Sequence, residues 1–247
     1  MISKFEKILT GFKIFNKDKR FLKNLMKGGR SLASYQLNTS VKNYCKNIKT
    51  IIDVGANKGQ FTVAASEIFP DAVIYSFEPV PEVFEKLKKN TLDLKKVRIF
   101  NEALGTTKGK IKFYKNKYSH ASSALPIHKN QTRLIPETSE TEIIEVKINR
   151  LENFLKDNSI DKPILLKLDV QGFEKEVIKG AGPGLPEIDY LLFETSFMEM
   201  YEGEPLFEEM HEFVKNVGYS LIAPVGFFQT SNFQIPQMDL LYKRMSK

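Results

Sequence analysis

The chain contains little cysteine and little histidine. Its 247 residues include one cysteine, Cys45, and three histidines, so neither an internal disulfide nor a Cys/His zinc site is expected. No apolar run approaches the roughly 18 residues of a membrane span. The first residues also lack the apolar segment of a secretory signal. These absences favour a soluble protein, and we expect a cytoplasmic location.

Acidic side chains are scarce at the N-terminus. Residues 1–30 hold nine Lys and Arg residues against two acidic residues, whereas the other 28 basic and 28 acidic residues balance, so this segment carries the net charge of +7. Apolar side chains recur in it at helical spacing: Phe5, Ile8, Leu9 and Phe12. We therefore predict that residues 1–47 form a basic, largely helical extension. Its basic face is either solvated, with the helix packed on the domain, or peripherally attached to an anionic membrane or an acidic partner.

From residue 50 onward, short β-rich apolar runs alternate with helical patterns. This alternation indicates a mostly parallel sheet covered by helices, so residues 48–247 are expected to form one α/β domain. The predicted strands are 50–54, 73–77, 97–101, 164–170 and 190–194. The predicted helices are 60–69, 81–90, 149–158 (capped by Asn149), 173–180 and 204–217, the last followed by a capping Gly218.

Two regions depart from simple alternation. Strand candidates at 110–114 and 141–149 flank a polar stretch, 119–140, whose length favours a lid or binding loop. The last two strand candidates, 219–223 and 238–243, are joined without a clear helix. A link of that kind predicts an antiparallel hairpin at the sheet edge.

The stretch "IIDVGANKGQF" places Gly55 and Gly59 between the first strand and the first helix of the domain. Glycines allow a ligand to approach the backbone, and free N–H groups at a helix start favour an anion. A dinucleotide is disfavoured, because Asn57 replaces the second glycine of G-x-G-x-x-G. The P-loop pattern G-x-x-x-x-G-K followed by Ser or Thr is absent.

Two acids narrow the choice of ligand. Asp53, at the end of the first strand, would repel a diphosphate but suits an ammonium group. Glu78, at the end of the second strand, can accept hydrogen bonds from both hydroxyls of a ribose. An amino acid joined to a nucleoside satisfies both acids. The expected ligand is therefore S-adenosylmethionine.

Four stretches together resemble the FkbM-type methyltransferases: "IIDVGANKGQF", "SFEPVPEVFEKLKKN", "NEALG" and "LLKLDVQGFEKEVIKGA". The resemblance extends over roughly residues 48 to 243 in matching order. It implies the class I S-adenosylmethionine-dependent fold, with strand order 3-2-1-4-5-7-6 and an antiparallel seventh strand. It also implies O-methylation, with sugar hydroxyls of glycans and natural products as common acceptors.

The resemblance assigns roles to named positions. Asp53, Gly55, Asn57 and Gly59 would hold the methionine end, Glu78 the ribose, and the turn at 101–103 the adenine. The full expected cofactor-binding set is Asp53, Gly55, Asn57, Gly59, Phe61, Glu78, Pro79, Asn101, Glu102 and Ala103.

Methyl transfer to an alcohol needs a base or a metal that removes the hydroxyl proton. Strand alternation puts Lys167 and Asp169 on one face, with Asp169 at the carboxyl end, so it is the leading candidate. Glu174, in the next helical turn, is the second catalytic candidate. Glu194 could share Mg²⁺ with Asp169, although two acids are too few to define a metal site. His120 and His128, in the expected lid, are alternative bases.

Three other functions are less consistent with the sequence. A nucleic-acid methyltransferase is disfavoured, because the chain has no Pro-Pro pair and is neutral beyond residue 30. A non-catalytic S-adenosylmethionine-binding subunit that supports a glycan-modifying partner is disfavoured by Asp169 and Glu174. An NAD-dependent oxidoreductase is disfavoured by Asn57 and Asp53. The sequence therefore predicts an O-methyltransferase acting on a sugar hydroxyl of a glycan, a surface polysaccharide or a glycosylated natural product. The expected partner is a small-molecule or glycan acceptor and no nucleic acid.

Overall fold

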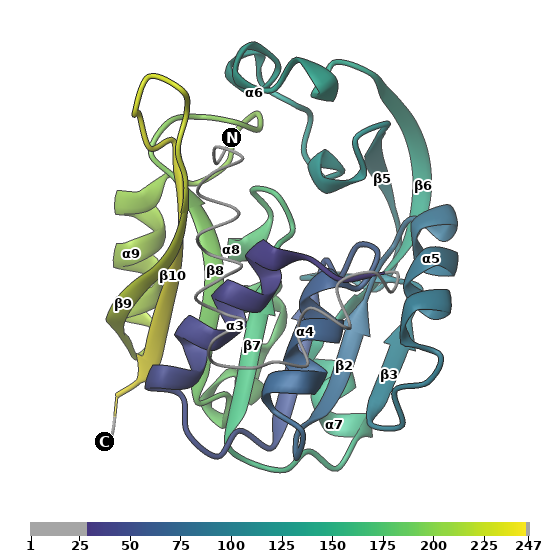
Figure 1. The fold of residues 1–247 in the computed structure, drawn as a ribbon, viewed down its shortest axis with the longest axis vertical. Coiled ribbons are helices and arrows are strands. Elements are labelled where there is room, and N and C mark those ends of the chain that lie inside the picture. Colours follow the sequence, from purple (N-terminus) through teal and green to yellow (C-terminus); the bar gives the residue numbers. More distant parts are fainter. Residues whose placement is uncertain (1–28, 246–247) are drawn as a thin grey trace.

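A computed structural model describes residues 29–245, which form two sheets and the helices around them (Figure 1). The strands of the larger sheet are β1 (Thr50–Val54), β2 (Val73–Phe77), β3 (Val97–Phe100), β7 (Ile164–Leu168), β8 (Tyr190–Ser196), β9 (Tyr219–Phe228) and β10 (Gln237–Arg244). They lie in the order β3-β2-β1-β7-β8-β10-β9. β10 is antiparallel to both of its neighbours, and the other pairs are parallel. The predicted order 3-2-1-4-5-7-6 is thus confirmed.

Helices cover both faces of this sheet because successive strand residues point to opposite sides. Ile51 packs beneath α3 (Leu32–Tyr44) and α4 (Gln60–Ile68), in the apolar cluster on one face. Ile52 packs on the other face, in the cluster formed with α7 (Leu151–Asp157), α8 (Glu174–Gly180) and α9 (Phe207–Asn216). Both isoleucines are fully buried. α5 (Pro81–Thr91) connects β2 to β3, and the 3-10 turn η3 (Gly182–Glu187) follows α8.

The second sheet consists of β4 (Ala103–Gly105), β5 (Gly109–Asn116) and β6 (Thr141–Arg150), in the order β4-β6-β5. β5 and β6 pair antiparallel along their length, which confirms both predicted extra strands. We call residues 109–150 the arm. It rises beside the carboxyl edge of the main sheet, at the upper right of Figure 1.

The polar stretch 119–140 lies within the arm and contains short helices: η1 (Ser119–Ala121), α6 (Lys129–Leu134) and η2 (Pro136–Thr138). Backbone hydrogen bonds join Tyr114 to Ser123, and an isolated bridge joins Ile127 to Tyr201. These links attach the stretch to β5 and to the segment after β8.

Two predicted helix starts are wrong. Asn149 belongs to β6 rather than capping a helix, because its Oδ1 accepts from the Arg150 amide and the Asn153 side chain, and α7 begins at Leu151. Glu204 lies in a turn before α9, where its carboxylate accepts the amides of Met200 and Tyr201. That helix therefore begins only at Phe207. The predicted cap is confirmed, since Gly218 has φ of 96° directly after the helix.

The fourth predicted strand ends two residues early, at Leu168, so Asp169 lies just beyond it. The predicted helix in residues 1–30 falls outside the described residues. Among residues 29–245, no helix combines the length and apolar character needed to cross a membrane.

Candidate active site

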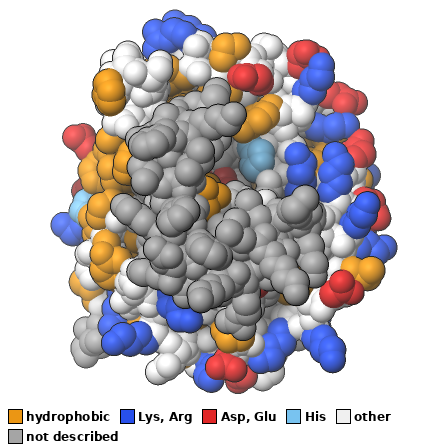
Figure 2. All heavy atoms as spheres, viewed as in Figure 1, with side chains coloured by type: hydrophobic (Ala, Val, Ile, Leu, Met, Phe, Trp, Pro, Cys, Tyr) orange, Lys and Arg blue, Asp and Glu red, His pale blue; other side chains and the backbone are white. Residues whose placement is uncertain are grey.

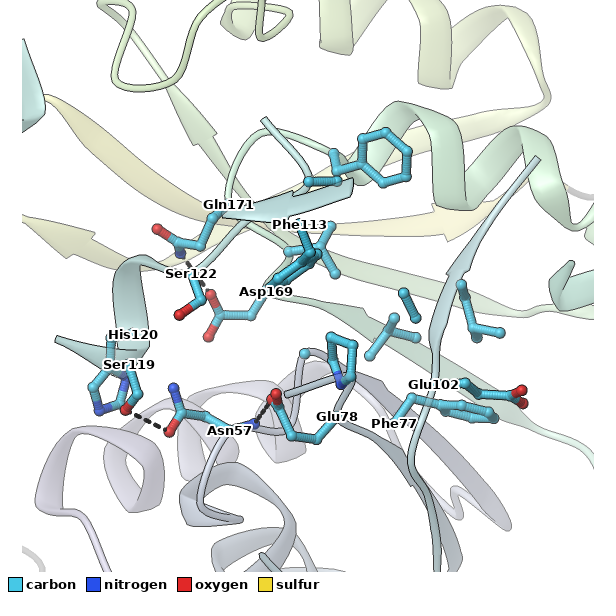
Figure 3. A pocket seen from close by; sticks show the side chains of 18 residues that line it. Asn57, Phe77, Glu78, Glu102, Phe113, Ser119, His120, Ser122, Asp169 and Gln171 are labelled. Atoms are coloured by element: carbon cyan, nitrogen blue, oxygen red, sulfur yellow. Dashed lines mark hydrogen bonds between the residues drawn. The ribbon is translucent and has the colours of Figure 1, made fainter. Parts of the chain in front are cut away.

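An open cavity of about 580 Å³ lies at the carboxyl ends of β1, β2 and β7. Its wall includes six of the predicted cofactor-binding residues and the leading catalytic candidate: Gly55, Asn57, Glu78, Pro79, Glu102, Ala103 and Asp169. Figure 3 shows Asn57, Glu78 and Asp169 directed toward a common space. The carboxyl edge of a parallel sheet is where such folds bind ligands.

The turn after β1 brings the backbone close to this cavity. Gly55 has φ of +79°, and a Cβ atom there would lie 2.0 Å from the carbonyl oxygen of Asp169. Only glycine allows the two strand ends to approach this closely. The amides of Gly55 and Ala56 both donate to the Phe77 carbonyl, at 3.0 and 2.9 Å. The turn is therefore anchored to β2 before any ligand binds.

Glu78 is buried at the end of β2, and its carboxylate organises the surrounding backbone. Oε2 accepts the Asn57 amide at 2.9 Å, and Oε1 accepts the Val80 amide at 2.8 Å. Burial raises the pKa of Glu78 to about 7, although these two amides oppose the rise. Asn101 does not line the cavity, but its Nδ2 donates to the Glu78 carbonyl at 2.9 Å. Asn101 therefore supports the position of Glu78.

Asp53, which was predicted to hold the methionine end, does not line the cavity. Its side chain is fully buried. Oδ1 accepts from Lys167 Nζ at 2.9 Å, and Oδ2 accepts from Thr62 at 2.7 Å. The ammonium beside Asp53 in this structure is that of Lys167, from β7. Burial would lower the pKa of Lys167, but the charges of Asp53 and Asp169 outweigh it and raise the pKa above its usual range.

Asp169 lies at the cavity wall with 42% of its side chain exposed. Its Oδ2 lies 3.5 Å from Lys167 Nζ, which confirms that these two residues share a face. Its Oδ1 accepts from Gln171 Nε2 at 2.7 Å. Asp169 therefore presents a negative charge to the cavity while the protein holds both of its oxygens.

Gln171 is a cavity residue that the sequence analysis missed. Its backbone has φ of 58°, a positive value that is uncommon for residues other than glycine. This conformation directs the amide toward three partners: Asp169, Glu194 and Tyr201, whose hydroxyl donates to Oε1 at 2.6 Å. The signal available in the sequence was its place between Asp169 and Gly172, at the turn after a buried strand.

Four other predicted site residues lie outside the cavity wall. Gly59, with φ of +87°, is the N-cap of α4, and Phe61 packs in the core with its ring 5.1 Å from Lys167 Nζ. Glu174 is buried, and its Oε1 accepts the Val170 amide at 3.0 Å; burial raises its pKa to about 8. Glu194 accepts from Gln237 at 2.9 Å. Glu174 and Glu194 therefore lie behind the cavity wall rather than in it.

The expectation of Mg²⁺ gains no support. Within residues 29–245, no three His, Cys, Asp or Glu side chains are grouped in a way that could hold a metal ion. Asp169 and Glu194 are instead linked through the amide nitrogen of Gln171.

The arm closes one side of the cavity. Ser119, His120 and Ser122 line it, and Ser119 Oγ donates to Asn57 Oδ1 at 3.1 Å, which joins the arm to the glycine turn (Figure 3). Of the two predicted lid histidines, only His120 reaches the cavity. His128 instead caps α6 through Nδ1, which accepts the Asn130 amide at 3.3 Å.

Basic and acidic side chains are interspersed on the described part of the face in Figure 2, on the right over α5 and the arm. Lys115 there pairs with Glu82 and Glu142, at 2.9 and 3.1 Å. The two carboxylates offset the positive charge of Lys115 locally.

The strand order, the antiparallel β10 and the glycine turn facing an acid at the end of β2 define a class I methyltransferase fold. The family model described as "Methyltransferase FkbM domain" matches residues 53–221, more than half of the chain. The chain therefore belongs to the FkbM methyltransferases.

Two curated relatives and one solved structure illustrate the similarity. The chain is 26% identical over 183 residues to 2-O-methyltransferase NoeI of Sinorhizobium fredii, covering 68% of this chain and 75% of that one. It is 27% identical over 143 residues to hexuronic acid methyltransferase AglP of Haloferax volcanii, covering 58% and 54%. Precorrin-6y C5,15-methyltransferase of Geobacter metallireducens superimposes with a TM-score of 0.47 and 13% identity, over 85% of this chain and 87% of that one.

Proposed function

We propose that this enzyme transfers a methyl group from S-adenosylmethionine to a hydroxyl of a sugar. One observation carries the proposal: the same cavity is lined by the glycine turn and Glu78, which suit the methyl donor, and by polar side chains of Asp169 and the arm, which suit an acceptor. Two relatives support the acceptor class, since one is named a 2-O-methyltransferase and another a hexuronic acid methyltransferase.

The residues present fit the methyl donor. Gly55 and Asn57 line the cavity, so the backbone of the turn is available to the methionine end. Glu78 retains lone pairs that can accept from ribose hydroxyls in addition to the two amides it already holds. Phe77, Leu104 and Phe113 add apolar surface to the wall, which suits an adenine ring beside Ala103.

The protein supplies position and charge to the reaction. S-adenosylmethionine provides a methyl group on a positively charged sulfur, which needs little help to leave. Asp169, held by Lys167 and Gln171, places a fixed negative charge at the reacting side of the cavity. A preorganised charge of this kind favours the transition state without reorganising during the reaction.

The first test is calorimetric titration of S-adenosylhomocysteine into the full-length protein and two variants. Binding to the wild type and at least tenfold weaker binding to Glu78→Gln are expected, because Gln replaces one acceptor oxygen with a donor that faces an amide. Glu85→Gln, an exposed acid on α5, is the matched control and should bind as the wild type does. Absence of binding to the wild type would overturn the proposal.

The second test identifies the acceptor class with donor carrying a labelled methyl group. Free uronic acids, amino sugars and short glycans are offered in parallel with RNA and duplex DNA. We expect label in a sugar and none in the nucleic acids. Label in RNA or DNA alone would replace the sugar with a nucleic-acid acceptor, while binding without transfer to any acceptor would favour a non-catalytic subunit.

A further inference from the structure

The arm carries one titratable side chain to the wall of the cavity, that of His120. The residue sits in the 3-10 turn Ser119–Ala121, and the neighbouring hydrogen bond from Ser119 to Asn57 fixes this turn against the glycine loop. Figure 3 shows His120 and Asp169 toward one side of the cavity and Glu102 toward the other. His120 therefore lies on the side where the acceptor, rather than the adenine, is expected.

The hydrogen bonding of His120 leaves a nitrogen lone pair on the ring. Its Nε2 lies 3.2 Å from Gln60 Nε2. Because an amide nitrogen only donates, this contact assigns Nε2 as the acceptor and places the ring proton on Nδ1. An incoming hydroxyl needs to replace only this one neutral hydrogen bond.

The surroundings of His120 lower its pKa and so favour the neutral imidazole. Although the side chain is exposed at the cavity mouth, packing by neighbouring atoms removes solvent from the ring and lowers its pKa. Asp169 acts in the opposite direction and raises the pKa, whereas Lys58 and Lys167 lower it further. The ring is therefore available to accept a proton.

Asp169 is less suited to that task. Gln171 donates to its Oδ1, and the Lys167 ammonium lies 3.5 Å from its Oδ2, so two donors fix the position of the carboxylate. A neutral imidazole is also a stronger base than an aspartate carboxylate, because the pKa of His exceeds that of Asp by roughly two to three units in model peptides. A carboxylate held in this way is better placed to stabilise a nearby imidazolium than to take the proton itself.

We propose that His120 is the general base that deprotonates the acceptor hydroxyl, with Asp169 as the positioning charge that stabilises the resulting imidazolium. This assignment rests on the methyl transfer proposed above. The hydroxyl proton passes to Nε2 of His120 as an oxygen lone pair forms the new bond to the methyl carbon. The carbon–sulfur bond breaks with its electron pair going to sulfur, which gives neutral S-adenosylhomocysteine, and the imidazolium returns its proton to water.

The other two histidines provide internal controls. Nδ1 of His128 accepts the Asn130 amide and lies 3.1 Å from the Glu199 carbonyl oxygen, and Nδ1 of His211 lies 3.0 Å from the Tyr242 hydroxyl. Neither lines the cavity. Their titrations should not respond to ligands of the site.

The deciding experiment is an NMR titration of the three histidines in the full-length protein, with the His120 signal assigned by its loss in His120→Gln. The pKa is measured with saturating S-adenosylhomocysteine and with saturating S-adenosylmethionine, which differ by the positive charge on sulfur. A positive charge in the same cavity should lower the pKa of His120 in the S-adenosylmethionine complex, by roughly one unit or more if the sulfur lies close to the ring. The two controls should be unchanged.

Equal pKa values of His120 in the two complexes would overturn its assignment as the base while leaving donor binding intact. Failure of both ligands to bind would instead overturn the proposed function and this assignment with it. Once an acceptor is identified, His120→Gln should lower kcat by roughly a hundredfold or more. Its affinity for S-adenosylhomocysteine should stay within about twofold, and the acidic limb of the pH profile should disappear. His128→Asn, which retains a capping side chain, should behave as the wild type does.

Discussion

Lys167 donates to Asp53 across two neighbouring strands, with 2.9 Å between Nζ and Oδ1, and neither side chain is more than 6% exposed. The two residues are register partners in the pairing of β1 with β7. The same ammonium lies 3.5 Å from Asp169, at the cavity wall. Asp53 thus acts on the site through Lys167, by fixing the cation that faces Asp169.

Removing the cation should therefore destabilise the fold. Lys167→Met leaves the fully buried Asp53 without its ion partner, and breaking a buried pair in this way costs about 3–5 kcal/mol. Lys110→Met is the matched control, because Lys110 pairs with Glu145 where both side chains are more than 60% exposed. It should leave stability almost unchanged, because exposed ion pairs contribute little. Urea unfolding gives the free energy of unfolding of both variants. Equal losses of stability would show that the buried Lys167–Asp53 pair contributes no more than the exposed Lys110–Glu145 pair.

The close approach at Gly55 gives a second prediction. Gly55→Ala places a Cβ atom 2.0 Å from the Asp169 carbonyl oxygen, whereas Gly203→Ala, at the similar φ of +73°, meets no atom within 4 Å. Both variants carry the left-handed backbone penalty of about 1–2 kcal/mol. Gly55→Ala should lose roughly 1–3 kcal/mol more through overpacking and also lose binding of S-adenosylhomocysteine. Thermal unfolding and calorimetry test this, and a Gly55→Ala protein that binds normally would contradict it.

Most of the fold could be predicted from the sequence, because alternating apolar runs and glycine-marked turns are local signals. The same local reasoning found Gly55, Asn57, Glu78 and Asp169, since each lies at the end of a strand or in the turn after it. Helix starts were less accurate where side chains such as Asn149 had competing hydrogen bonds nearby.

Long-range pairing was the part that local patterns could not supply. Asp53 and Lys167 are 114 positions apart, and their contact depends on the register of β1 against β7. The cavity position of His120 depends likewise on how the arm folds back, and its contact with Gln60 spans 60 positions. From the sequence, Asp53 was assigned to the ammonium of the ligand and His120 was one of two alternative bases in an expected lid, with no protein partner for either.

Replacing Asp169 with Asn removes its negative charge but keeps a side chain of similar size and shape. Asp169→Asn keeps an oxygen that can accept from Gln171 but removes the negative charge that raises the pKa of His120. The pKa of His120 should therefore fall in this variant, while binding of S-adenosylhomocysteine is retained. Methyl transfer should also slow, by roughly a hundredfold if the charge contributes as preorganised groups usually do.

The pKa is read by NMR titration, with His211 as the internal reference. Transfer is measured with the acceptor found by the labelling assay. A normal rate in Asp169→Asn would remove Asp169 from the reaction, and an unchanged His120 pKa would show that the two side chains do not interact.

The buried carboxyl of Glu174 predicts how stability depends on pH. Burial raises its pKa from about 4.5 to about 8, so between these values the native state holds a proton that the unfolded chain has released. Stability should therefore fall as pH rises from 5 to 8, by on the order of 3 kcal/mol from this group. Glu78, with its pKa raised to about 7, acts in the same direction.

Glu174→Gln isolates this contribution, because the amide resembles the protonated acid and its oxygen can still accept from Val170. The midpoint of thermal unfolding should fall between pH 5 and pH 8 in both proteins. The fall should be smaller in the variant than in the wild type, by roughly 5 °C or more. Glu212→Gln, an exposed acid on α9, should follow the wild-type curve. Parallel curves for Glu174→Gln and wild type would mean that Glu174 is already ionised in the native state. In that case its negative charge, like that of Asp169, would contribute to the field at the cavity.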